Sequence, residues 1–134
     1  MSFSRKALSV GVIAKCLAME RGVSLSDQEE FFVCGLLHDL GKIPLYHQFA
    51  DETRQVMALA GQNGGSAVNA ESVIFGLDHS MVGGLIARKW RLSPTFADVL
   101  TYHHRPSEAA VNNAQLVFMV ALADRYARSL ENDA

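Results

Sequence analysis

Apolar residues recur at three- and four-residue intervals along most of the chain, which is the spacing of amphipathic helices. No segment shows the sustained alternation of apolar and polar residues that is typical of strands. The sequence therefore predicts an all-α fold, a compact helical bundle of about six to seven helices. The expected helices cover residues 3–21, 27–39, 45–60, 69–75, 79–90, 95–104 and 113–130.

Local signals predict where several of these helices begin and end. Ser26-Asp27-Gln28-Glu29 has the form of a capping box, with a serine followed three residues later by a glutamate. Gly41 is predicted to end the helix that begins there. Asp78 is suited to cap the helix over 79–90. Ser93-Pro94 places a cap directly before a proline, which favours a helix start at that point.

Composition indicates an ordinary globular protein. With 134 residues, 49% hydrophobic and 19% charged, we expect a single domain over residues 1–134. A net charge of -2 argues against binding to a nucleic-acid polymer. Cys16 and Cys34 lie in apolar helical patterns without a CxxC spacing, so both are expected to be reduced. No apolar run suits a membrane span or a secretory signal, and the expected location is the cytoplasm.

The first candidate functional residues are His38 and Asp39, at the end of the apolar segment that starts at Phe31. A carboxylate at the end of a core helix requires a cation or several hydrogen-bond donors nearby, because burial of an unpaired charge is costly. All five histidines fall between residues 38 and 104. Imidazole and carboxylate groups suit zinc, manganese, iron or nickel. The residues that lie at predicted helix ends or beside an apolar face are His38, Asp39, His79, His103, His104 and Asp124.

The residues alone leave a second interpretation open. His38 is equally compatible with a hydrogen-bonded core histidine, and His103 and His104 with groups that complement a helix dipole. Asp124 has Arg125 and Arg128 as alternative partners on its own helix. Lys42, just after the histidine-aspartate pair, is suited either to a solvent-exposed position or to contact with a phosphate oxygen.

The motifs together resemble a known family. Gly-Leu-Leu-His-Asp-Leu-Gly-Lys, which contains His38 and Asp39, resembles the signature of the HD superfamily of metal-dependent phosphohydrolases, and Ala-Leu-Ala-Asp-Arg-Tyr around Asp124 matches its final aspartate ligand. Residues 76–83, 89–94 and 103–106 are most similar to the HDOD branch. That branch is associated with bacterial signalling proteins and is similar to the HD-GYP cyclic-dinucleotide phosphodiesterases. The resemblance covers about residues 3–130.

The resemblance implies a divalent metal centre with one or two ions, for which Fe, Mn, Zn, Ni and Mg are not distinguished. His38, Asp39 and Asp124 would hold one ion, and Asp39 would bridge to a second. The remaining three ligands, carried over by position, are His79, His103 and His104. Asp39 and Lys42 are the catalytic candidates, because two ions clamp a phosphodiester and generate the attacking hydroxide while a lysine steadies the phosphate.

The sequence departs from the family pattern in three places. The first ligand of the superfamily should come from the opening helix, where this chain has Lys6, which is not an ordinary metal ligand. The Gly-Tyr-Pro segment of the cyclic-dinucleotide enzymes is replaced by residues 106–110 (Pro-Ser-Glu-Ala-Ala). HDOD regions also usually carry an additional helical half, so the resemblance leads us to expect that this chain is a fragment or a compact form.

These observations predict a regulatory or output domain of bacterial signal transduction, with a divalent-metal site and little or no catalysis. The alternative is a metal-dependent phosphohydrolase that acts on phosphomonoesters, nucleotides or cyclic dinucleotides. A third interpretation assigns the histidines purely structural roles. The expected partners are a signalling protein or a second copy of the chain, together with a phosphoester or nucleotide ligand.

Overall fold

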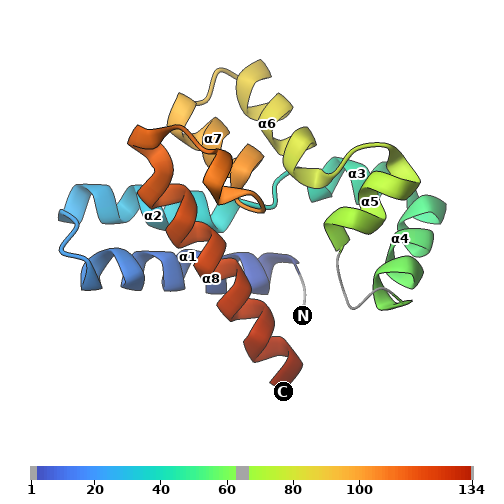
Figure 1. The fold of residues 1–134 in the computed structure, drawn as a ribbon, viewed down its shortest axis with the longest axis horizontal. Helices are drawn as coiled ribbons and strands as arrows, with labels where there is room; N and C mark the ends of the chain where they lie inside the picture. Colours follow the sequence, from blue (N-terminus) through green and yellow to red (C-terminus); the bar gives the residue numbers. More distant parts are fainter. Residues whose placement is uncertain (1–2, 63–66, 134) are drawn as a thin grey trace.

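The computed structural model describes residues 3–62 and 67–133 and confirms the all-α prediction (Figure 1). Two short 3-10 helices, η1 and η2, precede the last α-helix, and no strand occurs in these ranges. Within the same residues, no helix is both long and apolar enough to cross a membrane. The elements are α1 (Phe3–Glu20), α2 (Leu25–Leu37), α3 (Lys42–Gln48), α4 (Ala50–Gln62), α5 (Ala67–Phe75), α6 (His79–Lys89), α7 (Pro94–Tyr102), η1 (Pro106–Glu108), η2 (Val111–Asn113) and α8 (Ala114–Asp133).

The main core lies where α1, α2 and α8 pack together. Figure 1 shows α1 and α2 side by side, with α8 crossing them, α6 and α7 on one side and α3 to α5 at one end. Small residues allow the close packing of α1 on α2, since a Cβ at Gly35 would lie 2.9 Å from the Gly11 Cα. Two smaller apolar clusters join α4 to α5 and α6 to α7. The buried residues of the main core include Val10, Ala14, Phe31, Cys34, Val117, Val120 and Ala123.

The N-cap residues in the structure match the predicted ones at α6 and α7 and differ from the predicted one at α2. Asp78 accepts a hydrogen bond from the Met81 N–H, and Ser93 accepts one from the Phe96 N–H, so both predicted caps are confirmed. The cap of α2 is Ser24 rather than Ser26. Ser24 has the extended backbone of an N-cap, and its hydroxyl accepts from an amide three residues later, so the helix starts earlier than the predicted capping box.

The predicted helix over 45–60 is two helices in the structure. The chain leaves the helical conformation at Phe49, whose φ and ψ are -126° and 65°, and α4 begins at the next residue. The break turns α4 away from α3 and lets it pack against α5 at the end of the molecule. Apolar spacing alone does not reveal this break, because the periodicity resumes immediately.

Gly41 has a steric role rather than the predicted role of ending α2. The helix ends at Leu37, and Gly41 has a φ of -64°, which any residue adopts. A Cβ at this position would lie 2.0 Å from the His79 carbonyl oxygen and 2.6 Å from the Gly83 nitrogen. Only glycine therefore lets the turn after α2 lie directly against α6, which places residue 39 beside residue 79.

Replacing Gly41 with alanine is expected to destabilise the fold by about 3 kcal/mol or more, because the added methyl group meets backbone atoms that cannot rotate away. Gly61→Ala is the matched control: among the described residues outside its own helical turns, no atom lies within 4 Å of the added methyl group, and alanine favours a helix, so the stability should stay equal or rise by up to about 1 kcal/mol. Urea unfolding of both variants checks this. Equal stability of the two variants would contradict the steric role of Gly41.

Candidate metal centre

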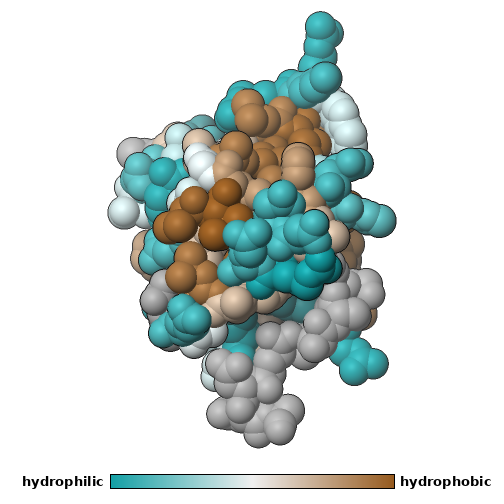
Figure 2. Space-filling model, turned by 90° about the vertical axis from the view of Figure 1, so that its right-hand side faces the viewer, coloured by the Kyte–Doolittle hydropathy of each residue, from teal (hydrophilic) through white to brown (hydrophobic). Residues whose placement is uncertain are grey.

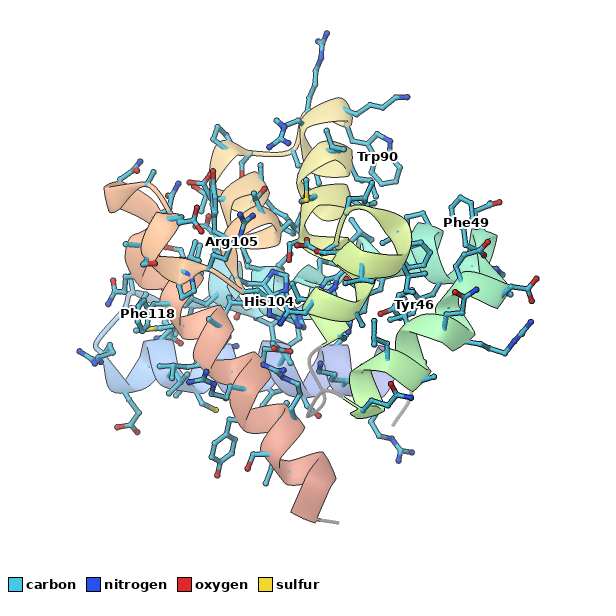
Figure 3. All side chains as sticks on the ribbon, turned by 45° about the vertical axis from the view of Figure 1, so that its right-hand side comes forward. Tyr46, Phe49, Trp90, His104, Arg105 and Phe118 are labelled. Carbon is cyan, nitrogen blue, oxygen red and sulfur yellow. The ribbon has the colours of Figure 1, made fainter. Side chains whose placement is uncertain are left out.

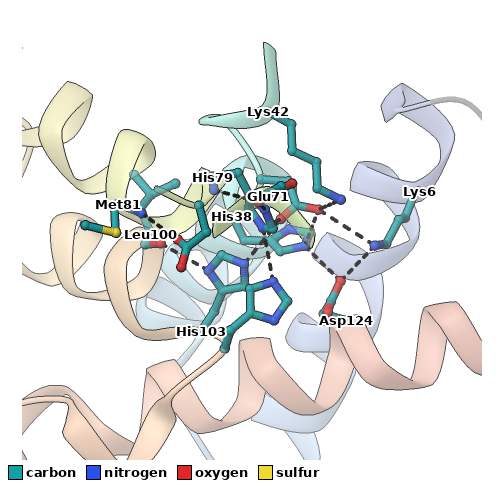
Figure 4. Close-up of polar contacts among 12 residues, drawn as sticks. Lys6, His38, Lys42, Glu71, His79, Met81, Leu100, His103 and Asp124 are labelled. Atoms are coloured by element: carbon teal, nitrogen blue, oxygen red, sulfur yellow. Dashed lines mark hydrogen bonds and ion pairs between the residues drawn. The ribbon is translucent and has the colours of Figure 1, made fainter. Parts of the chain in front are cut away.

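The structure brings all six predicted ligand residues into one buried cluster (Figure 4). They come from four separate places: the turn after α2, the first residue of α6, the end of α7 and the middle of α8. In Figure 3, His104 lies near the centre of the molecule, between α8 and the helices at the opposite end. The cluster consists of His38, Asp39, His79, His103, His104 and Asp124.

One half of the cluster joins His38 to two carboxylates. The His38 Nε2 atom lies 3.1 Å from the Asp124 Oδ1 atom and 3.2 Å from the Asp39 Oδ2 atom. The other ring nitrogen, Nδ1, donates a hydrogen bond of 2.7 Å to the Gly35 carbonyl. That bond fixes the ring so that Nε2 faces both carboxylates. Asp124 also contacts Arg128, one of its two alternative partners on α8. The Arg128 Nη2 atom lies 3.1 Å from the Asp124 Oδ2 atom.

The other half of the cluster places two histidines against the second oxygen of Asp39 and a third histidine beside them. The Asp39 Oδ1 atom lies 3.0 Å from the His79 Nε2 atom and 3.2 Å from the His103 Nε2 atom. The His79 Nε2 atom in turn lies 3.0 Å from the His104 Nε2 atom. One ligand atom from each of the four residues falls within 4.8 Å of all the others. Asp39 therefore stands between the two halves, with one oxygen directed into each.

The histidine half has the donor set of a metal site. The Nδ1–H of His103 donates to the carbonyls of Val99 and Leu100, so its Nε2 lone pair is directed at the Asp39 Oδ1 atom. The His103 Nε2 atom and the Asp39 Oδ1 atom lie 3.2 Å apart. Because both are then acceptors, they repel each other unless a cation or a proton lies between them. Burial, followed by the charges of the neighbouring histidines, lowers the pKa of His104 to about 2, which leaves that ring neutral. The residues present fit a divalent metal ion.

Glu71, on α5, is a site residue that the sequence prediction missed. Its side chain is fully buried, and its Oε1 atom accepts hydrogen bonds from the backbone N–H of His79, at 2.8 Å, and from the Nδ1–H of the same residue, at 2.7 Å. The hydroxyl of Tyr46 donates to its other oxygen. A carboxylate behind a histidine fixes the tautomer that directs Nε2 toward a metal. The one signal in the sequence is an acidic residue within the apolar segment Ala67–Phe75.

Cationic side chains from α1, α3 and α8 contact the carboxylates of the cluster. The Lys6 Nζ atom lies 3.0 Å from the Asp124 Oδ1 atom, and the Lys42 Nζ atom lies 3.3 Å from the Asp39 Oδ2 atom. Lys42 is only 14% exposed, so the solvent-exposed position is wrong, while contact with a phosphate oxygen stays a prediction. A cavity of about 500 Å³ opens over this region. Its polar lining consists of Lys6, Lys42, Asn69, His79, His104, Arg105, Asp124 and Arg128.

The charges of the cluster shift its pKa values strongly. Burial lowers the pKa of His38, but the charge of Asp39 and the hydrogen bond with Asp124 outweigh it and raise the pKa to about 9. Burial raises the pKa of the Asp39 carboxyl, but the charge of His38 and the hydrogen bonds from His38 and His79 lower it well below the usual range. The pKa of Asp124 is also lowered, through His38 and Lys6 against the effect of burial. Both carboxyl groups are therefore ionised at neutral pH.

Known proteins resemble the chain in sequence and in structure. A family model described as the HDOD domain matches residues 1–106. An HDOD domain protein with unknown function from Geobacter sulfurreducens is 31% identical, with a TM-score of 0.81, over 92% of this chain and 41% of that protein's chain. A protein from Shewanella amazonensis SB2B named "Putative phosphohydrolase" is 25% identical, with a TM-score of 0.80, over 97% of this chain and 46% of its own.

Among curated proteins, an uncharacterized protein from Treponema pallidum (strain Nichols) is 21% identical over 102 residues. That match covers 76% of this chain and 20% of the curated protein. The chain thus spans less than half of the length of the two solved structures and about a fifth of this curated relative. The similarity extends over nearly the whole fold, and the longer relatives contain further segments.

The raised pKa of His38 predicts a pH-dependent stability in metal-free protein. The stabilising effect is fully present below the ordinary pKa of 6.5 and is lost as the pH rises through about 9, amounting to at most about 3 kcal/mol. Urea unfolding of chelator-treated protein between about pH 6 and about pH 9.5 should show this loss in the wild type and a smaller loss in His38→Gln. His47→Gln, at an exposed position, serves as the control and should follow the wild type. Parallel curves for wild type and His38→Gln would contradict the assignment.

Proposed function

The chain belongs to the HDOD domain family, and we propose that it is a regulatory or output domain of bacterial signal transduction, in which the buried cluster binds a divalent metal ion with little or no catalysis. The observation that supports this function most directly is the convergence of three histidines beside Asp39, two of which contact its Oδ1 atom. Five of the six ligand residues lie within the matched residues 1–106, and the sixth, Asp124, lies on α8 beyond them.

The proposed ligands of the metal ion are the Asp39 Oδ1 atom and the Nε2 atoms of the three histidines His79, His103 and His104. This nitrogen-rich set favours Zn, Mn, Fe or Ni over Mg, because Mg²⁺ prefers six oxygen ligands with several waters. When bound, the ion supplies positive charge that attracts a phosphate oxygen or polarises a bound water. Glu71 keeps His79 in the tautomer that presents Nε2 to the ion.

The ligand that we propose beside the metal is a phosphoester or a nucleotide. The cavity next to the cluster is lined by lysine and arginine side chains, among them Lys42, Arg105 and Arg128, and His104 forms its wall on the side of the metal site. Arginine donates in a planar fork that matches phosphate oxygens, and lysine acts as a point charge. A cavity of about 500 Å³ has the size of a small-molecule site.

Binding without efficient turnover is proposed because the hydrolytic mechanism of the superfamily uses two ions. Here the second position, between His38 and Asp124, already contacts the Lys6 ammonium group. The name of the Shewanella amazonensis protein favours the alternative of a metal-dependent phosphohydrolase for that relative. For this chain, phosphoester hydrolysis is the result that would replace the proposed function.

The proposed partner is a signalling protein or a second copy of the chain. The surface formed by α3 to α5, which faces the viewer in Figure 2, carries apolar areas between hydrophilic ones. Ile43, Met57 and Val73 are the exposed apolar residues of three successive helices on this side. A second set lies on α1 and α8, where Val12 and Tyr126 are about half exposed. Exposed apolar surface of this kind is typical of interaction sites.

The proposed function predicts metal that depends on Asp39. Elemental analysis of protein purified without chelator should find a transition metal in the wild type and in Asp51→Ala, an exposed aspartate at the start of α4, and none in Asp39→Ala. Metal-loaded wild type should bind a nucleotide in calorimetry yet leave nitrophenyl phosphate esters and nucleotides unhydrolysed. Hydrolysis that disappears in Asp39→Ala would show a phosphohydrolase, and absence of metal from the wild type would contradict the proposed site.

Glu71→Gln is expected to weaken metal binding by roughly 10- to 100-fold, on the scale of effects known for groups behind metal ligands, because the amide no longer fixes the His79 tautomer. Glu29→Gln is the matched control, since Glu29 pairs with Lys15 at the surface, far from the cluster. Competition with a fluorescent zinc indicator measures both variants. Unchanged zinc affinity in Glu71→Gln would show that this residue only supports the fold.

A further inference from the structure

We infer that the Lys6 ammonium group takes the place of one metal ion, so that this chain binds a single ion at the three histidines and none between His38 and Asp124. The inference rests on the proposed function, because it concerns how many ions the proposed metal site holds. It replaces the expectation that Asp39 bridges two metal ions. Two features of the cluster support it: the contacts of Lys6, and the different surroundings of the two oxygens of Asp39.

Lys6 contacts the same atoms that a metal ion would need in this half of the cluster. The potential ligand atoms are the His38 Nε2 atom and one oxygen from each of Asp39 and Asp124. The Lys6 Nζ atom lies 3.0 Å from the Asp124 Oδ1 atom and 3.7 Å from the Asp39 Oδ2 atom, so it stands against two of the three. The side chain is only 14% exposed and projects from α1, which the main core holds in place.

The two oxygens of Asp39 divide the cluster into unlike halves. The Oδ2 atom is near His38 and two ammonium groups, those of Lys6 and Lys42, whereas the Oδ1 atom is near His79 and His103. The negative charge directed into the first half is thus already matched by positive charge. The second half offers a carboxylate oxygen and three imidazoles, and among the ion pairs of the described residues no lysine or arginine contacts the Oδ1 atom.

Charge repulsion from Lys6 also favours a metal ion in the histidine half over one between His38 and Asp124. A divalent ion held by Asp124 and the Asp39 Oδ2 atom would have to lie within a few ångströms of the Lys6 ammonium, and like charges at that distance in a buried site repel strongly. A charged ammonium has three donors and no lone pair, so it does not join the ligand set. At the histidine half the ion is farther from Lys6 and shares only Asp39 with it. The structure therefore favours one ion at that half.

The number of bound ions in four proteins tests this inference. Wild type, Lys6→Met, Lys6→Glu and the control Lys15→Met are dialysed against Mn²⁺, and bound manganese per chain is measured by elemental analysis together with the electron paramagnetic resonance spectrum. Wild type should hold one ion with an uncoupled spectrum, and so should Lys15→Met, since Lys15 lies on the same helix as Lys6 but pairs with Glu29 at the surface. Lys6→Glu should hold two ions with a spin-coupled spectrum.

Lys6→Met removes the charge without adding a ligand, and it should take up a second ion only at higher Mn²⁺ concentration. This variant decides the outcome if Lys6→Glu fails to fold, as judged by circular dichroism. Two ions in the wild type, or one ion at every concentration in folded Lys6→Met and Lys6→Glu, would overturn the inference and leave the proposed metal site standing. No manganese in any of the four proteins would instead overturn the proposed metal site.

Discussion

The burial of the Asp39 carboxylate is the constraint on which the rest of the site depends. An ionised carboxylate inside a protein requires cations and donors from every side, and here His79 and His103 meet one oxygen while His38, Lys6 and Lys42 meet the other. These partners come from α1, from the turn and helix after α2, from α6 and from the end of α7. The charge of one residue therefore ties together segments that the apolar core alone would pack less specifically.

The surrounding backbone is built to keep this carboxylate in place. Because Gly41 has no side chain, the turn after α2 lies directly on the start of α6, and Asp39 comes within 3.0 Å of His79. Glu71 then fixes His79 from behind, on a helix that belongs to the other end of the molecule. The proposed metal site is thus oriented from both sides, and the cavity lined by lysine and arginine side chains beside it also reaches His79 and His104.

Much of this arrangement is predictable from the sequence, for physical reasons that also mark its limits. Helical periodicity indicates the fold class, and the placement of histidines at helix ends correctly indicates that they converge. The break at Phe49 was missed because periodicity continues on both sides of it. Glu71 was missed because its role depends on His79, which the tertiary fold brings back to it. The resemblance drew attention to Lys6, but only the structure shows which oxygen atoms it contacts.

Our central claim is that one metal ion is held by one carboxylate oxygen and three imidazoles around Asp39. X-ray absorption at the zinc edge of the zinc-loaded wild type tests it most directly, since multiple scattering counts imidazole ligands and a heavy neighbour reveals a second ion. We expect three imidazoles, light-atom scattering from the carboxylate, and no zinc-zinc distance. A spectrum with a zinc-zinc distance, or with fewer than three imidazoles, would contradict the claim.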